Sequence, residues 1–547
     1  MKPRCGTRRD ALRWRDIALR AGVRTVILSL VALALMVGVA YAAGDPTGAA
    51  TGGAGDVTAA VAGQPTLAEV AGDLGHLEIA TNVFFVIVGV ALIFFMQAGF
   101  MLVETGFCRG KNAAHVAMTN FVIFAIGALA YWAVGFGLQF GSFGPIGLLG
   151  GAQGVLDGDA FTLFGQALAG TKGFFLGSLG DGTLDVGAFA FFLFQMVFMD
   201  TAATIVTGGM AERWKFSAFV PFGVFMAVVT YPIYGMWVWG GGWLAQLGVN
   251  AGLGHGVVDF AGSSVVHAVG GFSALAGALV IGPRIGKFKP DGTPVAIPGH
   301  HIPMAILGTI VLVFGWMGFN GMSTLSAGDL RFPIIIANTI LAGAAGCITA
   351  MFLVWKLWGH PDPSMSANGM LAGLVAVTAP CAFITPWAAV VIGTVAGLLV
   401  VGSVLFWERK AKIDDPVGAV SVHGVNGLWG MLALGLFADG TYGAGWNGVE
   451  GAVTGLFYGD GGQLVAQLIA CVVVALWAFG TMYAFFRIQD KVQGVRSTEA
   501  DELAGLDVTE MGVMAYPDFA GSGALGAGSY TEAPLDPVAT TEGGAVA

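Results

Sequence analysis

The sequence predicts an all-α membrane protein of eleven transmembrane helices, built as two inverted five-helix repeats plus a final helix. Three observations lead to this prediction: the composition, the number of long apolar stretches and a short internal repeat. The 547-residue chain is 56% hydrophobic and only 11% charged, whereas soluble domains carry about 25% charged residues. A soluble fold of this length could not bury so much apolar surface, so we expect lipid to be its solvent.

The N-terminal region is typical of a secretory signal. A basic segment ends at Arg24, an apolar run covers 26–39, and Ala40-Tyr41-Ala42 fits a cleavage site. The alternative is an uncleaved first helix. The expected domains are a signal peptide at 1–42, a periplasmic segment at 43–77, a transmembrane domain at 78–490, a cytoplasmic regulatory tail at 491–516 and a disordered tail at 517–547.

Apolar stretches of membrane-spanning length follow one another from residue 82 onward, separated by Gly, Pro and charge clusters. Two connecting loops, near 141–185 and 438–462, are long and rich in Gly, and we expect them to be surface loops on the outer side. The predicted helices cover 82–104, 114–140, 186–208, 217–239, 258–282, 302–320, 332–356, 367–384, 387–407, 417–437 and 463–486.

The basic residues indicate how these helices cross the membrane. With the mature N-terminus outside, the cytoplasmic loops and C-terminal tail hold fourteen Lys and Arg residues, and the outside holds only Lys172 and Arg331. Basic residues concentrate in cytoplasmic loops of membrane proteins, so this separation supports the count of eleven. We therefore expect a multi-pass protein of the inner (plasma) membrane, with its N-terminus outside and its C-terminus in the cytoplasm.

A short internal repeat connects the fifth and tenth predicted helices. The segment from Asp259 to His267 parallels the segment from Asp415 to His423, with Asp, Gly, Val and His in equivalent positions. Because each half contains five helices, the second half must run inverted, which is a known transporter architecture. Each His lies about 12 Å from its helix start at 1.5 Å per residue. In a hydrocarbon core of about 30 Å the two rings would differ in depth by only about 6 Å, and they could be neighbours.

Histidines at this depth suggest a transport pathway. Ionisable groups inside a membrane usually face a pathway or a partner, although a satisfied core residue is the alternative for each ring. A neutral imidazole donates a hydrogen bond from one nitrogen and accepts one at the other. A pair of them could therefore hold a small hydrogen-bonding solute or relay a proton.

Several motifs in order resemble the ammonium transporter family (Amt/Mep/Rh), in particular its bacterial Amt branch. The resemblance covers about 78–516. The motifs are Asp259-Phe-Ala-Gly-Ser-Ser-Val-Val-His267, Gly315-Trp-Met-Gly-Phe319-Asn320, Asp415 to His423 followed by Gly-Val-Asn-Gly, Ala211-Glu212-Arg213, and Gly505-Leu-Asp507-Val-Thr-Glu-Met-Gly-Val-Met-Ala-Tyr516.

The resemblance implies a homotrimer with one pore per subunit. It places an outer recruitment site for the ammonium ion at Phe198, Trp239 and Ser323, where aromatic faces attract the cation and the hydroxyl accepts a hydrogen bond. Phe198 and Phe319 would stack as a gate below that site, and His267 and His423 would line the pore. The tail motif implies regulation by a PII-type protein at the cytoplasmic face.

Four acidic residues lie within or beside the predicted helices. Asp259 and Asp415 would support the site indirectly, by capping their helices and shaping the vestibule, or would be plain N-caps. Asp200 is an acid within an apolar helix; it could be hydrogen-bonded by Thr201 or Thr204, be neutral, or face a subunit interface. Glu104 ends the first predicted helix, where we expect a solvated or helix-paired acid.

The function that the resemblance implies is ammonium transport. The ion would be recruited outside, lose a proton near the gate, and pass as ammonia along the two histidines; methylammonium would act as an analogue. An ammonium sensor that signals through its tail is the alternative. The sequence shows no nucleophile–base pair, phosphate loop or basic nucleic-acid surface, and its five cysteines have no ligand spacing, so we expect neither an enzyme nor a metal or other cofactor.

Overall fold

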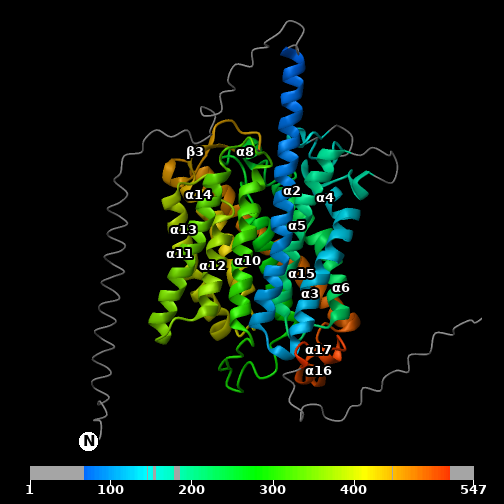
Figure 1. The fold of residues 1–547 in the computed structure, drawn as a ribbon, viewed down its shortest axis with the longest axis vertical. Helices are drawn as coiled ribbons and strands as arrows, with labels where there is room; N and C mark the ends of the chain where they lie inside the picture. The colour runs from blue at the N-terminus through cyan, green and yellow to red at the C-terminus, as the bar shows by residue number, and fades with distance from the viewer. Residues whose placement is uncertain (1–66, 145, 152–155, 178–184, 446, 518–547) are drawn as a thin grey trace, which may run out of the picture.

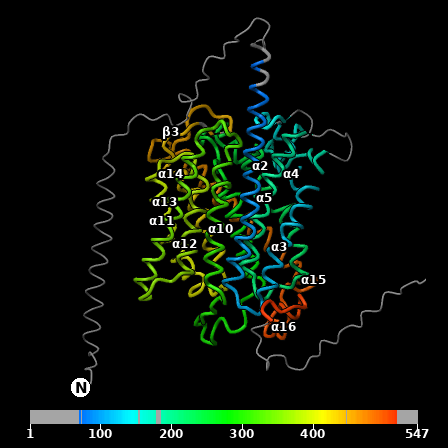
Figure 2. Tube along the Cα trace, in the orientation of Figure 1, coloured from blue at the N-terminus to red at the C-terminus, as the bar shows by residue number. Residues whose placement is uncertain are grey.

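The structure is a computed structural model. It describes residues 67–517 except 145, 152–155, 178–184 and 446. Within these residues the chain forms a bundle of long helices that run alongside one another (Figure 1), and the Cα trace shows how segments distant in sequence interleave (Figure 2). The predicted signal peptide, most of the segment 43–77 and the segment 518–547 lie outside the described residues.

Ten helical segments in the described part of the chain are long and apolar enough to cross a membrane. The remaining predicted stretch, 367–384, overlaps the shorter helix α12, which begins four residues earlier at Pro363, has 15 residues and packs against α11 and α13. This helix ends early because the chain then forms turns that Asn338 closes by donating to the backbone oxygens of Cys381 and Ile384. The prediction of eleven transmembrane helices is therefore confirmed.

The helical segments of the bundle are as follows, in chain order. They are α2 (Leu67–Phe107), α3 (Ala113–Ala130) with η2 (Tyr131–Gly135) and α4 (Phe136–Phe140), α5 (Val186–Met210), α6 (Phe216–Phe225) with η5 (Met226–Thr230) and α7 (Tyr231–Val238), η6 (Ser263–Ala268) with α9 (Val269–Ile281), α10 (Ile302–Gly321) with η7 (Met322–Thr324), α11 (Phe332–Trp358), α12 (Pro363–Val377), α13 (Pro386–Phe406) with η8 (Trp407–Ala411), η9 (Val420–Val425) with α14 (Asn426–Phe437), and α15 (Gly461–Gln493).

Short elements distinguish the two ends of the bundle. One end, which we call the hairpin face, carries the antiparallel pairs β1–β2 and β3–β4. The other end, the tail face, carries the short helices after α15 (Figure 1). The short elements are η1 (Gly110–Asn112), η3 (Gly147–Leu149), β1 (Ala160–Leu163), β2 (Gln166–Gly170), η4 (Phe174–Gly177), α8 (Leu247–Ala251), β3 (Asp439–Ala444), β4 (Ala452–Thr454), η10 (Leu456–Tyr458), α16 (Glu499–Ala504) and α17 (Leu506–Thr509).

The first helix is longer than the sequence suggested. α2 begins at Leu67 rather than at 82 and contains 41 residues. At 1.5 Å per residue it exceeds a hydrocarbon core of about 30 Å, and its first turns project beyond the other helices at the hairpin face (Figure 1). The last part of the segment 43–77 is thus continuous with the first membrane helix.

The internal repeat is visible in the backbone. η6 and η9 are both six-residue π turns, and each follows a glycine with positive φ: Gly262 at 113° and Gly418 at 83°. Only glycine adopts this conformation without strain, so the chain turns there before the helix begins. The starts predicted at 258 and 417 were therefore several residues too early.

Small residues let the two repeats touch. A Cβ atom on Gly271 of α9 would lie 2.1 Å from the backbone nitrogen of Gly424 in η9. A side chain at that position has no room, so the backbones of the two repeats are in direct contact. Such close approaches are typical of glycine-rich helix interfaces in membranes.

Candidate functional site

The two histidines of the repeat meet where η6 and η9 pack together. The Nδ1 atoms of His267 and His423 are 3.2 Å apart, and the ring centroids are 5.3 Å apart. Both side chains are buried. A hydrogen bond between two imidazole nitrogens requires one donor and one acceptor, so a neutral pair must hold complementary tautomers.

Asp259 and Asp415 hold the two π turns in place. The carboxylate of Asp259 accepts hydrogen bonds from the backbone amides of 262–265 and from the Ser264 hydroxyl, at 2.7–3.0 Å. The carboxylate of Asp415 accepts from the backbone amides of 418–420, at 2.8–3.1 Å. Both acids therefore accept from backbone amides at the start of a π turn, at equivalent positions of the repeat, while the residues directly before the turns are Gly262 and Ala419.

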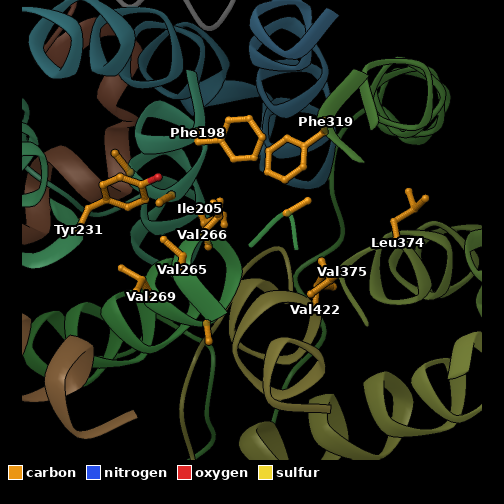
Figure 3. Close-up of a cluster of buried hydrophobic side chains, with 14 of the residues drawn as sticks. Phe198, Ile205, Tyr231, Val265, Val266, Val269, Phe319, Leu374, Val375 and Val422 are labelled. Carbon is orange, nitrogen blue, oxygen red and sulfur yellow. The ribbon is translucent and has the colours of Figure 1, made fainter. Parts of the chain in front are cut away.

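Aromatic rings cover the histidine pair on the side of the hairpin face. The ring centroids of Phe198 and Phe319 are 4.1 Å apart, and Trp239 meets Phe198 edge-on at 5.9 Å. Both phenylalanines are buried, and Figure 3 shows their rings facing each other. Below them, the ring of His267 stacks on Phe319 at 5.6 Å. These rings cover His267 on the side of the hairpin face.

The other residues of the predicted recruitment site are held by backbone oxygens. The Trp239 indole donates to the Asp259 carbonyl at 2.7 Å, which ties this ring to the loop before η6. Ser323 donates to the Phe319 carbonyl at 2.6 Å. Its proton is therefore used within the chain, and its oxygen can act only as an acceptor toward a ligand. The structure brings Phe198, Trp239 and Phe319 together, and places Ser323 one turn beyond Phe319.

Sequence reasoning missed two aromatic residues of the site. Trp316 stacks on His267 with centroids 5.0 Å apart and donates to the Thr378 hydroxyl at 2.9 Å. It lies three residues before Phe319 and so on the same helix face, a signal that the sequence contained. The ring centroid of Phe100 in α2 lies 6.0 Å from that of His423. No pattern in the sequence indicated that Phe100 belongs to the site.

A cavity of about 20 Å³ adjoins the histidine pair on the side of the tail face. It is large enough for one water-sized molecule. His423, Phe100, Val417, Asn368 and Glu104 are among the residues that line it. Glu104 is 2% exposed and is hydrogen-bonded by side chains of neighbouring helices, so the prediction of a helix-paired acid holds and that of a solvated acid is wrong.

Asp200 is buried within the described chain. Thr201 donates its proton to the Val197 carbonyl and Thr204 donates to Gln97, so neither threonine donates to Asp200. The Oδ1 atom of Asp200 has no hydrogen-bond partner among the described residues. With 2% exposure it does not lie on the outer surface, which excludes the subunit-interface interpretation and leaves that of a neutral acid.

Charged residues form a buried cluster near the tail face. Arg284 donates to Asp414 at 2.8–2.9 Å through three nitrogens and to Glu212 at 2.7 Å. Arg213 donates to the Asp414 carbonyl at 2.8 Å. Burial by itself would raise the pKa of Asp414, but the guanidinium groups of Arg213 and Arg284 hold that pKa well below its ordinary value. The cluster joins loops from three parts of the chain.

The C-terminal tail packs on the same face. Asp507 accepts from the His115 backbone amide at 2.8 Å, and the Leu506 amide donates to the Asn112 side chain at 2.9 Å. Tyr516 hydrogen-bonds a ring nitrogen of His300 at 2.9 Å. The tail therefore contacts both the start of α3 and the loop before α10.

The fold and the site together define a polytopic membrane transporter with inverted repeats and a central histidine pair. A model of the Ammonium Transporter Family matches residues 83–516, and the chain belongs to this family. It is 48% identical to "Ammonium transporter Amt2" of Archaeoglobus fulgidus over 430 residues, which are 78% of this chain and 86% of the relative. It is 37% identical to "Ammonium transporter Amt1" of Haloferax mediterranei over 467 residues, 83% of each chain.

Solved structures have the same fold. A structure described as "Sensor Amt Protein" aligns with a TM-score of 0.69 at 36% identity, covering 80% of this chain and 99% of the other. The crystal structure of Candida albicans Mep2 aligns with a TM-score of 0.65 at 26% identity, covering 77% of this chain and 87% of the other.

Proposed function

We propose that this protein transports ammonium by recruiting the ion at Phe198, Trp239 and Ser323 and passing ammonia along His267 and His423. The contact between the two imidazoles carries the proposal: their nitrogens lie 3.2 Å apart. Family membership and the names of the relatives support ammonium, with methylammonium as an analogue, as the substrate. The same findings favour transport over sensing as the primary function.

The physical chemistry of the pore favours ammonia as the species that crosses its centre. A bare cation in an apolar passage loses its hydration, which costs many kcal/mol. The rings of Phe198 and Phe319 offer no hydrogen-bond acceptor, so a proton is best released before them. Beyond them, ammonia donates to an imidazole nitrogen or accepts from its N–H, as a small neutral solute requires.

The assembly and orientation complete the proposal. The protein works as a homotrimer in the inner membrane, with the hairpin face outside and the tail face in the cytoplasm. The basic residues of the loops support this orientation. A PII-type protein binds the tail face and blocks the pore. The docked tail supports this, because it touches several loops there through Asp507, Leu506 and Tyr516.

Flux measurements on histidine variants test the pore. In proteoliposomes, His267→Ala and His423→Ala should each lower ammonium and methylammonium flux sharply or lose selectivity against potassium. Each variant leaves one buried imidazole without its hydrogen-bond partner, which costs about 1–3 kcal/mol of folding free energy. The chain should therefore still fold and insert. His115→Ala is the matched control, because His115 is also a buried imidazole but lies on α3, near the tail. Wild-type flux and selectivity in both pore variants would refute the proposal.

A further inference from the structure

Glu104 is a buried carboxyl group at the tail-face end of the pore that the proposed pathway does not use. It lines the same small cavity as His423 and Phe100. None of the seven salt bridges in the described part of the chain involves Glu104. A buried carboxylate with no cation beside it is strongly disfavoured, so its protonation state needs an explanation from its neighbours.

The hydroxyl of Thr207 indicates that Glu104 is protonated. Its oxygen lies 2.7 Å from Oε2 of Glu104 and 2.5 Å from the backbone oxygen of Thr204. A hydroxyl has one proton, and a helical threonine commonly gives it to a carbonyl three or four residues earlier. Thr201 does so in the same helix. Because the Thr207 hydroxyl has one proton and lies close to two oxygens, both contacts are full hydrogen bonds only if the Glu104 carboxyl supplies a second proton.

Neighbouring groups hold this carboxyl at the cavity wall. Asn120 of α3 donates to Oε2 of Glu104 at 2.7 Å and to the Val116 carbonyl at 3.0 Å, which orients the amide. Gly208 of α5 leaves room for the other oxygen, since a Cβ there would lie 2.9 Å from Oε1. The acid is therefore positioned by two helices rather than left to rotate into solvent.

We propose that Glu104 is the proton donor that converts ammonia to ammonium at the tail-face end of the pore. The inference rests on the proposed passage of ammonia along His423. The carboxyl O–H bond breaks and a new N–H bond forms, which leaves an ammonium ion beside a Glu104 carboxylate in the cavity. The ion departs to the tail-face solution, and hydronium from that solution returns a proton to the carboxylate and becomes water.

Flux and infrared spectroscopy on the full-length protein in liposomes test this assignment. Glu104→Gln keeps the size and shape of the side chain but has no acidic proton, so flux should fall on the order of 10²-fold. The half-saturating ammonium concentration should not change, because recruitment occurs at the other end of the pore. Glu104→Asp keeps an acid and should recover part of the flux. Asp200→Asn is the matched control: it also replaces a buried carboxyl, but one outside the cavity lining, and should keep wild-type flux.

A spectroscopic signature separates proton transfer from a structural role. Addition of ammonium to the wild-type protein should reduce the carbonyl band of a neutral carboxyl group and produce a carboxylate band. The change should be absent in Glu104→Gln and shifted in frequency in Glu104→Asp, which remains informative if the Gln variant does not fold. Wild-type flux in Glu104→Gln, or a carboxyl band that ammonium leaves unchanged, would overturn the inference. If Glu104→Gln transports normally while His423→Ala does not, only this inference fails; if both transport normally, the pore itself is wrong.

Discussion

The two sides of the histidine pair share a backbone arrangement and differ in how neighbouring side chains cover the pair. Toward the hairpin face, Asp259 caps η6, and the rings of Phe198 and Phe319 cover His267. Toward the tail face, Asp415 caps η9, and a cavity of about 20 Å³ lies beside His423. The repeat therefore places the two histidines, whereas side chains from helices outside the π turns decide which end is sealed and which has room for a molecule.

The first prediction tests the backbone contact between the two repeats. Gly271→Ala should have the largest effect, because its Cβ would lie 2.1 Å from the Gly424 backbone nitrogen. Gly424→Ala is the matched change, because its Cβ would meet nothing closer than 3.4 Å. We expect little folded Gly271→Ala protein and near-normal Gly424→Ala protein, measured by size-exclusion chromatography and thermal unfolding in detergent. Equal yields would show that the two backbones do not pack as described.

The second prediction concerns the buried charge cluster of Arg284, Asp414 and Glu212 near the tail face. Asp414→Asn leaves the buried Arg284 guanidinium with less compensation and should destabilise the protein by about 3–5 kcal/mol. Because the pKa of Asp414 is lowered in the folded state, its stabilising contribution is fully present above its unfolded pKa of about 4 and is lost as the pH falls. The difference in melting temperature between wild type and variant should therefore shrink in acid. A constant difference would contradict this interpretation.

The third prediction compares the two caps directly and has the smallest expected effect. Asp259 accepts from four backbone amides and a hydroxyl, whereas Asp415 accepts from three backbone amides. Replacement by Asn keeps one acceptor oxygen, so each variant should lose on the order of 1 kcal/mol, with the larger loss at Asp259. Thermal unfolding of Asp259→Asn and Asp415→Asn, measured side by side, checks the order. A larger loss at Asp415 would show that the number of accepted hydrogen bonds does not set the contribution of each acid.

Much of the fold was predictable because lipid imposes a simple rule on sequence. Every backbone polar group in the bilayer core must be satisfied within its own helix, so apolar length maps onto helices. That rule gave eleven segments, and the spacing of eight residues from Asp to His placed His267 and His423 at similar depth. The starts of η6 and η9 were predicted too early because the length of an apolar stretch contains no information about the positive φ of Gly262 and Gly418.

Local pattern and tertiary structure thus determine different features of this protein. Apolar length, the loop charges and the repeated Asp-to-His segment are properties of the chain itself, and they determine the membrane class, the helix count and the paired histidines. Which side chains converge on those histidines depends on helices far apart in sequence, as Trp316 and Phe100 show. The protonation state that we infer for Glu104 depends on its contacts with Asn120 and Thr207, which lie on two other helices. Burial and hydrogen-bond partners exist only once the helices pack, so tertiary structure alone decided them.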